Sequence, residues 1–151
     1  MASSALRIAT PSDAPTLAEL HTTARRISMP YLPRLHTDEE THRWMSGVVI
    51  PTMEVWVAEE KGKISGYIAV AHDIVDQLYV APQRHHRKVG SRLLEKAKEL
   101  RPEGLRLHCF TRNAPARAFY ESRGFVPLSF TDGERNEERL PDVMYEWKKP
   151  A

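Results

Sequence analysis

The chain has 151 residues, of which 41% are hydrophobic and 28% are charged, as in an ordinary globular protein, and its length predicts a single domain over residues 1–151. The net charge of +2 is too small to argue for a nucleic-acid partner, and no apolar run predicts a membrane-spanning helix. The single cysteine, Cys109, excludes an internal disulfide and a cysteine-rich zinc site and fits a reducing, cytoplasmic compartment.

The first part of the chain alternates between strand and helix signals. Residues 6–9 predict a short strand, and the helix that follows must end at residues 29–33, where two prolines forbid its continuation. Thr37 and Glu40 have the spacing of a capping box, so a second helix is predicted to start there and to run through Trp44.

Three strands are predicted next, over residues 53–59, 63–71 and 74–80. Gly62 lies between the first two, where a hairpin turn favours a positive φ. The first two strands carry apolar residues on both faces, which indicates a sheet that is covered on both sides.

A basic turn connects the third of these strands to a predicted helix over residues 89–100. The start of a helix presents free backbone N–H groups and the positive end of the helix dipole, which together suit a phosphate group. This prediction is strengthened by the positively charged side chains in and after the turn, namely Arg84, Arg87, Lys88 and Arg92. The alternative is that the basic turn is simply a solvated surface.

The last third of the chain completes the predicted sheet. Residues 105–110 form a strand, and a short helix follows with Asn113 as its N-cap and Gly124 just after its end. Residues 126–130 and 143–147 predict a final antiparallel pair, whose exposure would allow a homodimer.

The segment from Asp76 to Phe125 resembles the GNAT superfamily of acetyl-CoA-dependent N-acetyltransferases. The resemblance rests on the strand end Leu-Tyr-Val-Ala-Pro, the helix start Val-Gly-Ser-Arg-Leu-Leu and the later Asn-Ala-Pro-Ala-Arg-Ala-Phe-Tyr-Glu-Ser-Arg-Gly-Phe. It implies an α/β (α+β) fold with a mixed, mostly antiparallel central sheet, helices on both faces and a splayed central strand pair.

The resemblance also implies where acetyl-CoA binds. The family's pyrophosphate signature is Gln or Arg, two residues, Gly, one residue, then Gly or Ala. Here Gly90 matches it, whereas His85 replaces the Gln or Arg and Lys88 replaces the first glycine. The cofactor-binding residues expected on this basis are Leu78, Tyr79, Val80, His85, His86, Arg87, Lys88, Val89, Gly90, Ser91, Asn113, Ala116 and Tyr120. Backbone N–H groups near Leu78 and Val80, at a bulge, are expected to polarise the thioester carbonyl.

Two residues are expected to carry the proton transfers of direct acetyl transfer to a primary amine. Tyr120 matches the general-acid tyrosine of the family and would assist the leaving thiolate. Asp76 is the candidate base, with Asp73 and His108 in reserve; the alternative is that Asp76 is an ordinary polar strand residue.

No metal site is expected, because the adjacent histidines His85 and His86 are poorly placed to chelate one ion. Cys109 is expected to be a packing residue rather than a nucleophile. A small-molecule amine is the preferred acceptor. A protein N-terminus or lysine stays open, as does a non-catalytic, CoA-binding regulatory domain.

Overall fold

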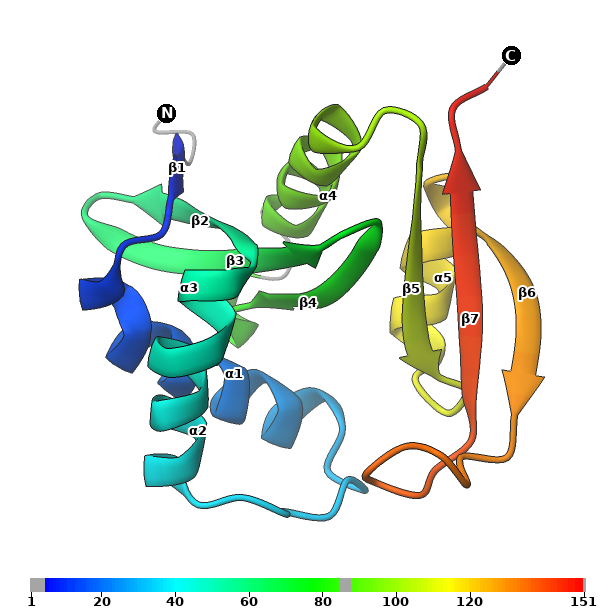
Figure 1. Cartoon of the computed structure of the whole chain (residues 1–151), viewed down its shortest axis with the longest axis horizontal. Coiled ribbons are helices and arrows are strands. Elements are labelled where there is room, and N and C mark those ends of the chain that lie inside the picture. Colours follow the sequence, from blue (N-terminus) through cyan, green and yellow to red (C-terminus); the bar gives the residue numbers. More distant parts are fainter. Residues whose placement is uncertain (1–4, 85–87, 151) are drawn as a thin grey trace.

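A mixed sheet of seven strands forms the centre of the protein (Figure 1). The structure is a computed structural model and describes residues 5–84 and 88–150. The strand order is β1-β2-β3-β4-β5-β7-β6, and all neighbouring pairs are antiparallel except β4 and β5, which are parallel. The strands are β1 (Ala5–Ile8), β2 (Glu54–Glu60), β3 (Lys63–Ala71), β4 (Ile74–Val80), β5 (Gly104–Phe110), β6 (Val126–Thr131) and β7 (Asp142–Lys148). The predicted fold class is confirmed.

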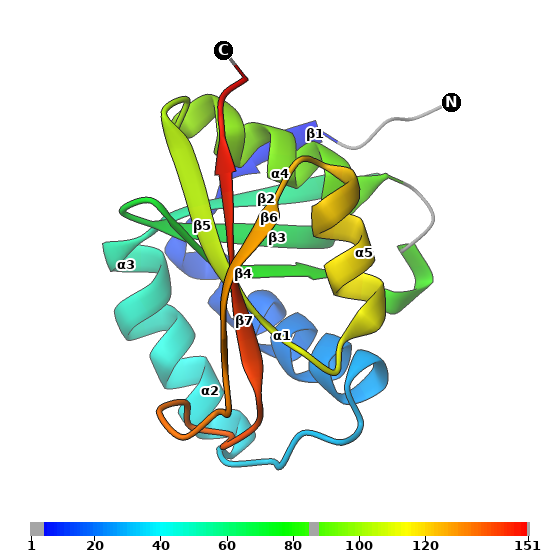
Figure 2. The ribbon, with the colours of Figure 1, turned by 90° about the vertical axis from the view of Figure 1, so that its right-hand side faces the viewer.

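Helices cover both faces of the sheet, as the two-sided apolar pattern of the strands predicts (Figure 2). They are α1 (Ala14–Ser28), α2 (Asp38–Trp44), α3 (Ile50–Thr52), α4 (Val89–Leu100) and α5 (Ala114–Ser122). One apolar cluster joins α1 and the segment after α2 to one face, and a second joins α4 and α5 to the other. Each face of the sheet therefore has its own core.

Local signals predicted the ends of several elements correctly. Thr37 forms its capping box with Glu40, and the Asn113 side chain accepts a hydrogen bond from the N–H of Ala116 at 3.3 Å. Gly124 has φ +90° after α5, and Gly62 has φ +77° in the β2–β3 hairpin. These contacts reach only three or four residues along the chain, which is why the sequence alone reveals them.

The second helix, α2, ends at Trp44 as predicted, but the helical segment that follows it was not predicted. The chain stays helical beyond α2 through a wide turn, Met45–Val49, and then α3. Met45 and Val49 are both fully buried against the α1 side of the sheet. Because helical continuation buries both side chains, tertiary packing extends the helix.

The bulge of β4 also lies elsewhere than predicted. The pairing with β3 is regular from Gly66↔Val80 to Ala69↔Gln77, so Leu78 is not at a bulge, and the next pair is Val70↔Val75. Asp76 is therefore the extra, unpaired residue. Val75 packs under α4 and Gln77 is buried on the opposite face, and the extra residue lets both be buried.

Candidate active site

The central strands β4 and β5 separate almost as soon as they meet (Figure 1). Their only paired position in the described residues is Ile74↔Arg106, next to a hydrogen bond from the Arg106 N–H to the Asp73 carbonyl at 2.8 Å. The predicted splay is thus confirmed. Beyond this point the facing backbone groups of the two strands are not paired with each other, and side chains from both halves of the sheet line the opening.

Two cavities meet at this opening. One, here called the α4 groove, has a volume of about 660 Å³ and runs from the start of α4 past α5 to the end of α1. The other, here called the β4–β5 cavity, has a volume of about 520 Å³ and lies between the diverging strands and the β6–β7 loop. Both volumes are in the range of small-molecule sites. Six residues line both cavities, namely Met29, Leu78, Tyr79, Asn113, Ala116 and Tyr120.

The start of α4 forms one end of the α4 groove. Lys88 has φ +61° and ψ +15°, the left-handed conformation that glycine adopts most easily. The chain thus takes a glycine-like turn although the signature glycine is missing. Lys88, Gly90 and Ser91 line the groove, whereas the Val89 side chain is buried in the core and has only its backbone to offer a ligand. His85, His86 and Arg87 lie outside the described residues.

The groove can also accept the phosphates of a nucleotide on chemical grounds. A Cβ atom added at Gly90 would be in van der Waals contact with Phe119 at 3.5 Å and with Val80 at 3.6 Å, so the absence of a side chain leaves room there that a Cβ would fill. The first turn of α4 offers backbone N–H groups, and Lys88 adds positive charge. The residues present therefore fit the diphosphate group of coenzyme A.

Sequence reasoning missed Arg123, which follows α5 and also lines the α4 groove. Its Nε donates a hydrogen bond to Ser91 Oγ at 3.0 Å, and its guanidinium lies 4.4 Å from the centre of the Phe119 ring. A second cation beside the start of α4 favours an anionic ligand there. The available signal was the position of Arg123 one helical turn beyond Phe119 and Tyr120.

Tyr120 lies where the two cavities meet. Its ring makes edge contacts with Phe119 and Phe125, with centres 5.3 and 5.7 Å apart. No residue of the described parts of the chain hydrogen-bonds its hydroxyl. Burial is the main cause that raises the pKa of Tyr120 above its usual 10, and the nearby Cys109 raises it further. The phenol therefore stays protonated at neutral pH. The geometry thus offers a neutral hydrogen-bond donor at the junction.

Leu78 and Val80 face the α4 side of the sheet, and Tyr79 faces the α1 side. All three line the α4 groove. The Tyr79 hydroxyl accepts a hydrogen bond from Arg25 Nη1 at 2.9 Å, so this tyrosine is tied to α1. Asn113 and Ala116 are brought to the same place by the cap of α5.

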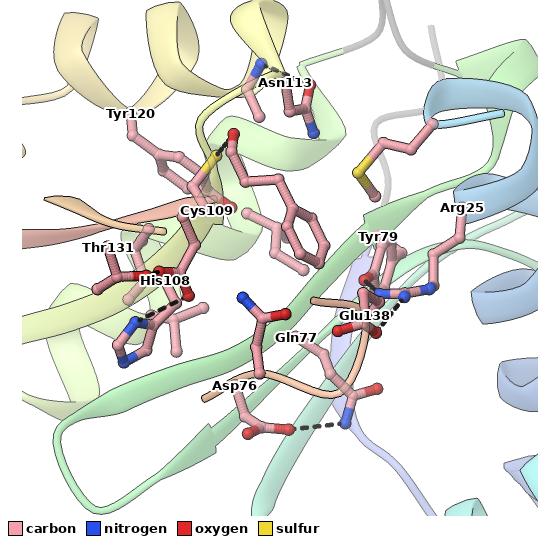
Figure 3. A pocket seen from close by; sticks show the side chains of 18 of the residues that line it. Arg25, Asp76, Gln77, Tyr79, His108, Cys109, Asn113, Tyr120, Thr131 and Glu138 are labelled. Atoms are coloured by element: carbon pink, nitrogen blue, oxygen red, sulfur yellow. Dashed lines mark hydrogen bonds and ion pairs between the residues drawn. The ribbon is translucent and has the colours of Figure 1, made fainter. Parts of the chain in front are cut away.

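Asp76, at its bulge, lines the β4–β5 cavity, and Figure 3 shows it beside Gln77. Its carboxylate is exposed and forms no ion pair with any residue in the described ranges. His108 lines the same cavity, with Nδ1 3.8 Å from an Asp142 oxygen, whereas Asp73 lines neither cavity. Of the candidate bases, Asp76 is therefore the carboxylate available to a cationic guest.

Arg25 and Glu138, whose pairing no sequence pattern predicted, close one side of the β4–β5 cavity (Figure 3). The Arg25 Nη2 atom lies 2.9 Å from Glu138 Oε2, and both side chains are largely buried. The adjacent Glu137 contacts His36 of the α1–α2 loop. These two contacts, here called the loop clasp, join the α1 region to the β6–β7 loop. Figure 1 shows the β6–β7 loop beside the loop that joins α1 to α2.

Cys109 lines the β4–β5 cavity but is poorly suited to be a nucleophile. Its side chain is buried, and its Sγ lies 3.6 Å from the Phe110 carbonyl oxygen. Burial raises the pKa of the thiol to about 11, so very little thiolate is present at neutral pH. This agrees with its interpretation as a packing residue.

Comparison with known proteins decides the family. The model of the acetyltransferase (GNAT) domain matches residues 51–127. A probable N-acetyltransferase of Mycobacterium tuberculosis is 30% identical in an alignment that covers 97% of this chain and 94% of that protein. The chain belongs to the GNAT acetyltransferases. It is thus an acetyl-CoA-dependent acetyltransferase, as its sequence predicts.

Other GNAT proteins are similar over different lengths. A peptidyl-lysine N-acetyltransferase of Escherichia coli is 30% identical, and the alignment covers 61% of this chain but only 62% of that protein. A GCN5-related N-acetyltransferase from Rhodopseudomonas palustris shares the fold with a TM-score of 0.79 and 21% identity, over 98% of this chain and 97% of its own. The PaiA N-acetyltransferase of Thermoplasma acidophilum, solved with coenzyme A, has a TM-score of 0.73 and 18% identity, over 97% of this chain and 99% of its own.

Within 5–84 and 88–150, no group of three or more His, Cys, Asp or Glu side chains is arranged to hold a metal ion. In the same ranges, no helix has the length and apolar character needed to cross a membrane.

Proposed function

We propose that this acetyltransferase transfers the acetyl group of acetyl-CoA directly to the primary amine of a small molecule, with Asp76 as base and Tyr120 as hydrogen-bond donor to the leaving thiolate. The observation that carries the proposal is the position of the Tyr120 hydroxyl. It has no hydrogen-bond partner among the described residues, and it lies where the α4 groove meets the β4–β5 cavity. A thioester that enters from the groove would meet an amine from the cavity beside this phenol.

In this proposal the pantetheine chain lies along β4, whose unpaired backbone groups can bind its amides. The diphosphate group lies at Lys88, Gly90 and Ser91, with Arg123 nearby. The predicted contribution of His85, His86 and Arg87 remains part of the proposal. A backbone N–H beyond the splay would stabilise the oxyanion of the tetrahedral intermediate by a few kcal/mol.

The amine must lose a proton before or during the attack. An alkylammonium with a pKa of about 10.4 costs roughly 4–5 kcal/mol to deprotonate at pH 7. Asp76 is a carboxylate in the cavity with no cationic partner in the described parts of the chain, so it would both attract the ammonium and accept its proton. The C–N bond forms, the C–S bond breaks, and coenzyme A leaves as a thiolate.

Tyr120 stabilises that thiolate mainly by hydrogen bonding. The conjugate thiol has a pKa of about 8.5, and burial raises the pKa of Tyr120 above 10. Complete proton transfer from the phenol would therefore be uphill by at least ~2 kcal/mol. Solvent supplies the proton after the thiolate has left the site.

The loop clasp supports a small acceptor. The Arg25–Glu138 ion pair joins α1 to the β6–β7 loop beside a cavity of about 520 Å³. A folded protein surface would have to part these loops before its lysine reached Asp76, whereas a small amine would not. The similarity to a peptidyl-lysine acetyltransferase makes a peptide lysine the second candidate.

An amine panel tests the proposal. The enzyme is incubated with acetyl-CoA and one amine at a time, and thiol release is measured. The amines are polyamines, amino acids, aromatic amines, aminoglycosides, lysine peptides and peptides with free N-termini. We expect the largest kcat/KM for a small amine. A larger kcat/KM for a lysine peptide would support the second candidate. Coenzyme A binding without turnover of any amine would contradict the assigned roles of Asp76 and Tyr120.

A further inference from the structure

A row of hydrogen bonds runs from the buried face of the sheet to Asp76. The hydroxyl of Tyr67, on β3, donates to Gln77 Oε1 at 2.6 Å. Gln77 Nε2 in turn donates to Asp76 Oδ2 at 3.1 Å (Figure 3). Tyr67 is fully buried and Gln77 is 5% exposed. Tyr67 lines neither the α4 groove nor the β4–β5 cavity. Its link to the cavity is therefore indirect, through Gln77.

The bulge makes this row possible. In a regular strand, consecutive side chains point to opposite faces, and an amide cannot easily reach its neighbour's carboxylate. Here Asp76 is the extra residue between the pairs Val70↔Val75 and Ala69↔Gln77. The local kink turns the carboxylate so that the next side chain can bond it.

The chemistry of the three groups fixes the direction of the row. An ionised carboxylate only accepts hydrogen bonds, so the NH₂ end of the Gln77 amide must face Asp76. The amide oxygen then faces Tyr67, whose hydroxyl must donate. Burial raises the pKa of Tyr67 well above 10, so this hydroxyl keeps its proton at any working pH.

We propose that Tyr67 and Gln77 are positioning residues, which hold the Asp76 carboxylate toward the acceptor amine. This inference rests on the proposed role of Asp76 as base. An exposed aspartate on a bulge has several rotamers, and only some of them face the amine. A buried amide anchored at its far end selects one of these rotamers before substrate binds.

A double-mutant cycle tests the proposal, with acetyl-CoA and the panel amine that gives the highest kcat/KM. We expect Tyr67→Phe to lower kcat about fivefold to tenfold and to leave the Kd of acetyl-CoA unchanged. Asp76→Asn should lower kcat further, and Tyr67→Phe should have no added effect in the Asp76→Asn background. Tyr145→Phe is the matched control. It removes another hydroxyl from a fully buried tyrosine, one that bonds Arg117 and Glu121 instead.

A second variant separates positioning from stability. Tyr67→Phe combined with Gln77→Met removes both buried partners and should be nearly neutral for folding, yet kcat should still fall. Full kcat in either variant would overturn the proposal, as would a Tyr67→Phe effect that persists in Asp76→Asn. Full kcat in Asp76→Asn would instead refute Asp76 as the base, and the positioning role with it.

A spectroscopic measurement reports on the row without any acceptor. The two side-chain N–H protons of Gln77 should give separate, slowly exchanging NMR signals in the wild type. In Tyr67→Phe these signals should move together and exchange faster. Unchanged signals would show that Tyr67 does not hold the amide.

Discussion

Replacing Tyr120 by phenylalanine tests the central contact of the proposed mechanism. The phenyl ring would keep the edge contacts with Phe119 and Phe125. The hydroxyl has no hydrogen-bond partner in the described residues, so its loss should leave the free energy of unfolding almost unchanged. In the transition state it would face a developing thiolate, and a hydrogen bond to a charged group contributes about 1.5–3 kcal/mol. The expected loss in kcat is therefore about 10- to 150-fold.

The assay is thiol release from acetyl-CoA with the best amine of the panel, together with the Kd of acetyl-CoA in the absence of amine. The neutral sulfur of the thioester is a weak acceptor, so the Kd should change less than about threefold. Burial raises the pKa of Tyr120, so the wild type should show no change in kcat from this group between pH 6 and 9. A kcat equal to the wild type, or a loss only in acetyl-CoA affinity, would refute the reasoning.

Four further changes have defined outcomes. Burial lowers the pKa of His21 from 6.5 to about 3, so its neutral ring stabilises the fold fully above pH 6.5, and this stability is lost as the pH falls toward 3. Between pH 7 and pH 5, the free energy of unfolding measured with urea should fall by about 2 kcal/mol less in His21→Phe than in the wild type. Lys88→Gly should raise the free energy of unfolding by up to about 1 kcal/mol, because it relieves a φ of +61°, and weaken coenzyme A binding by up to about fivefold in calorimetry. Cys109→Ala should keep kcat within about threefold, because the buried thiol with a pKa of about 11 is not a nucleophile. Glu138→Gln breaks the ion pair with Arg25, so it should cost about 1–3 kcal/mol in urea unfolding and raise the kcat/KM of lysine peptides relative to small amines.

Two of these predictions have a matched control variant. His42→Phe changes an exposed histidine of α2 and is the matched control for His21→Phe. Glu134→Gln removes an exposed charge from the same loop as Glu138 and should leave acceptor preference unchanged. The His21 prediction would be contradicted if the variant and the wild type showed equal pH dependence of stability, and the Cys109 prediction by a large loss of kcat. Unchanged acceptor preference would contradict the Glu138 prediction, and tighter coenzyme A binding would contradict the Lys88 prediction.

The order of the elements and several of their ends could be predicted because their signals are local. The bounds of β4, the cap at Asn113 and the turn at Gly62 depend on neighbours a few residues away. The GNAT resemblance added the splayed pair and the place of Tyr120. The helical extension beyond Trp44 was missed, because it is driven by the burial of Met45 and Val49 under α1.

The sequence by itself determined the family and the mixed sheet, and it suggested candidate residues for holding a diphosphate and a leaving thiolate. Only the tertiary structure decided which side chains meet. Arg25 contacts Glu138 across 113 positions of the chain, and Tyr67 reaches Gln77 because the strands pair in one register. The direction of Asp76 depends on a bulge, which arises from the need to bury Val75 on one face and Gln77 on the other. Such contacts depend on register and packing between distant segments, and periodicity and capping along the chain give no information about these.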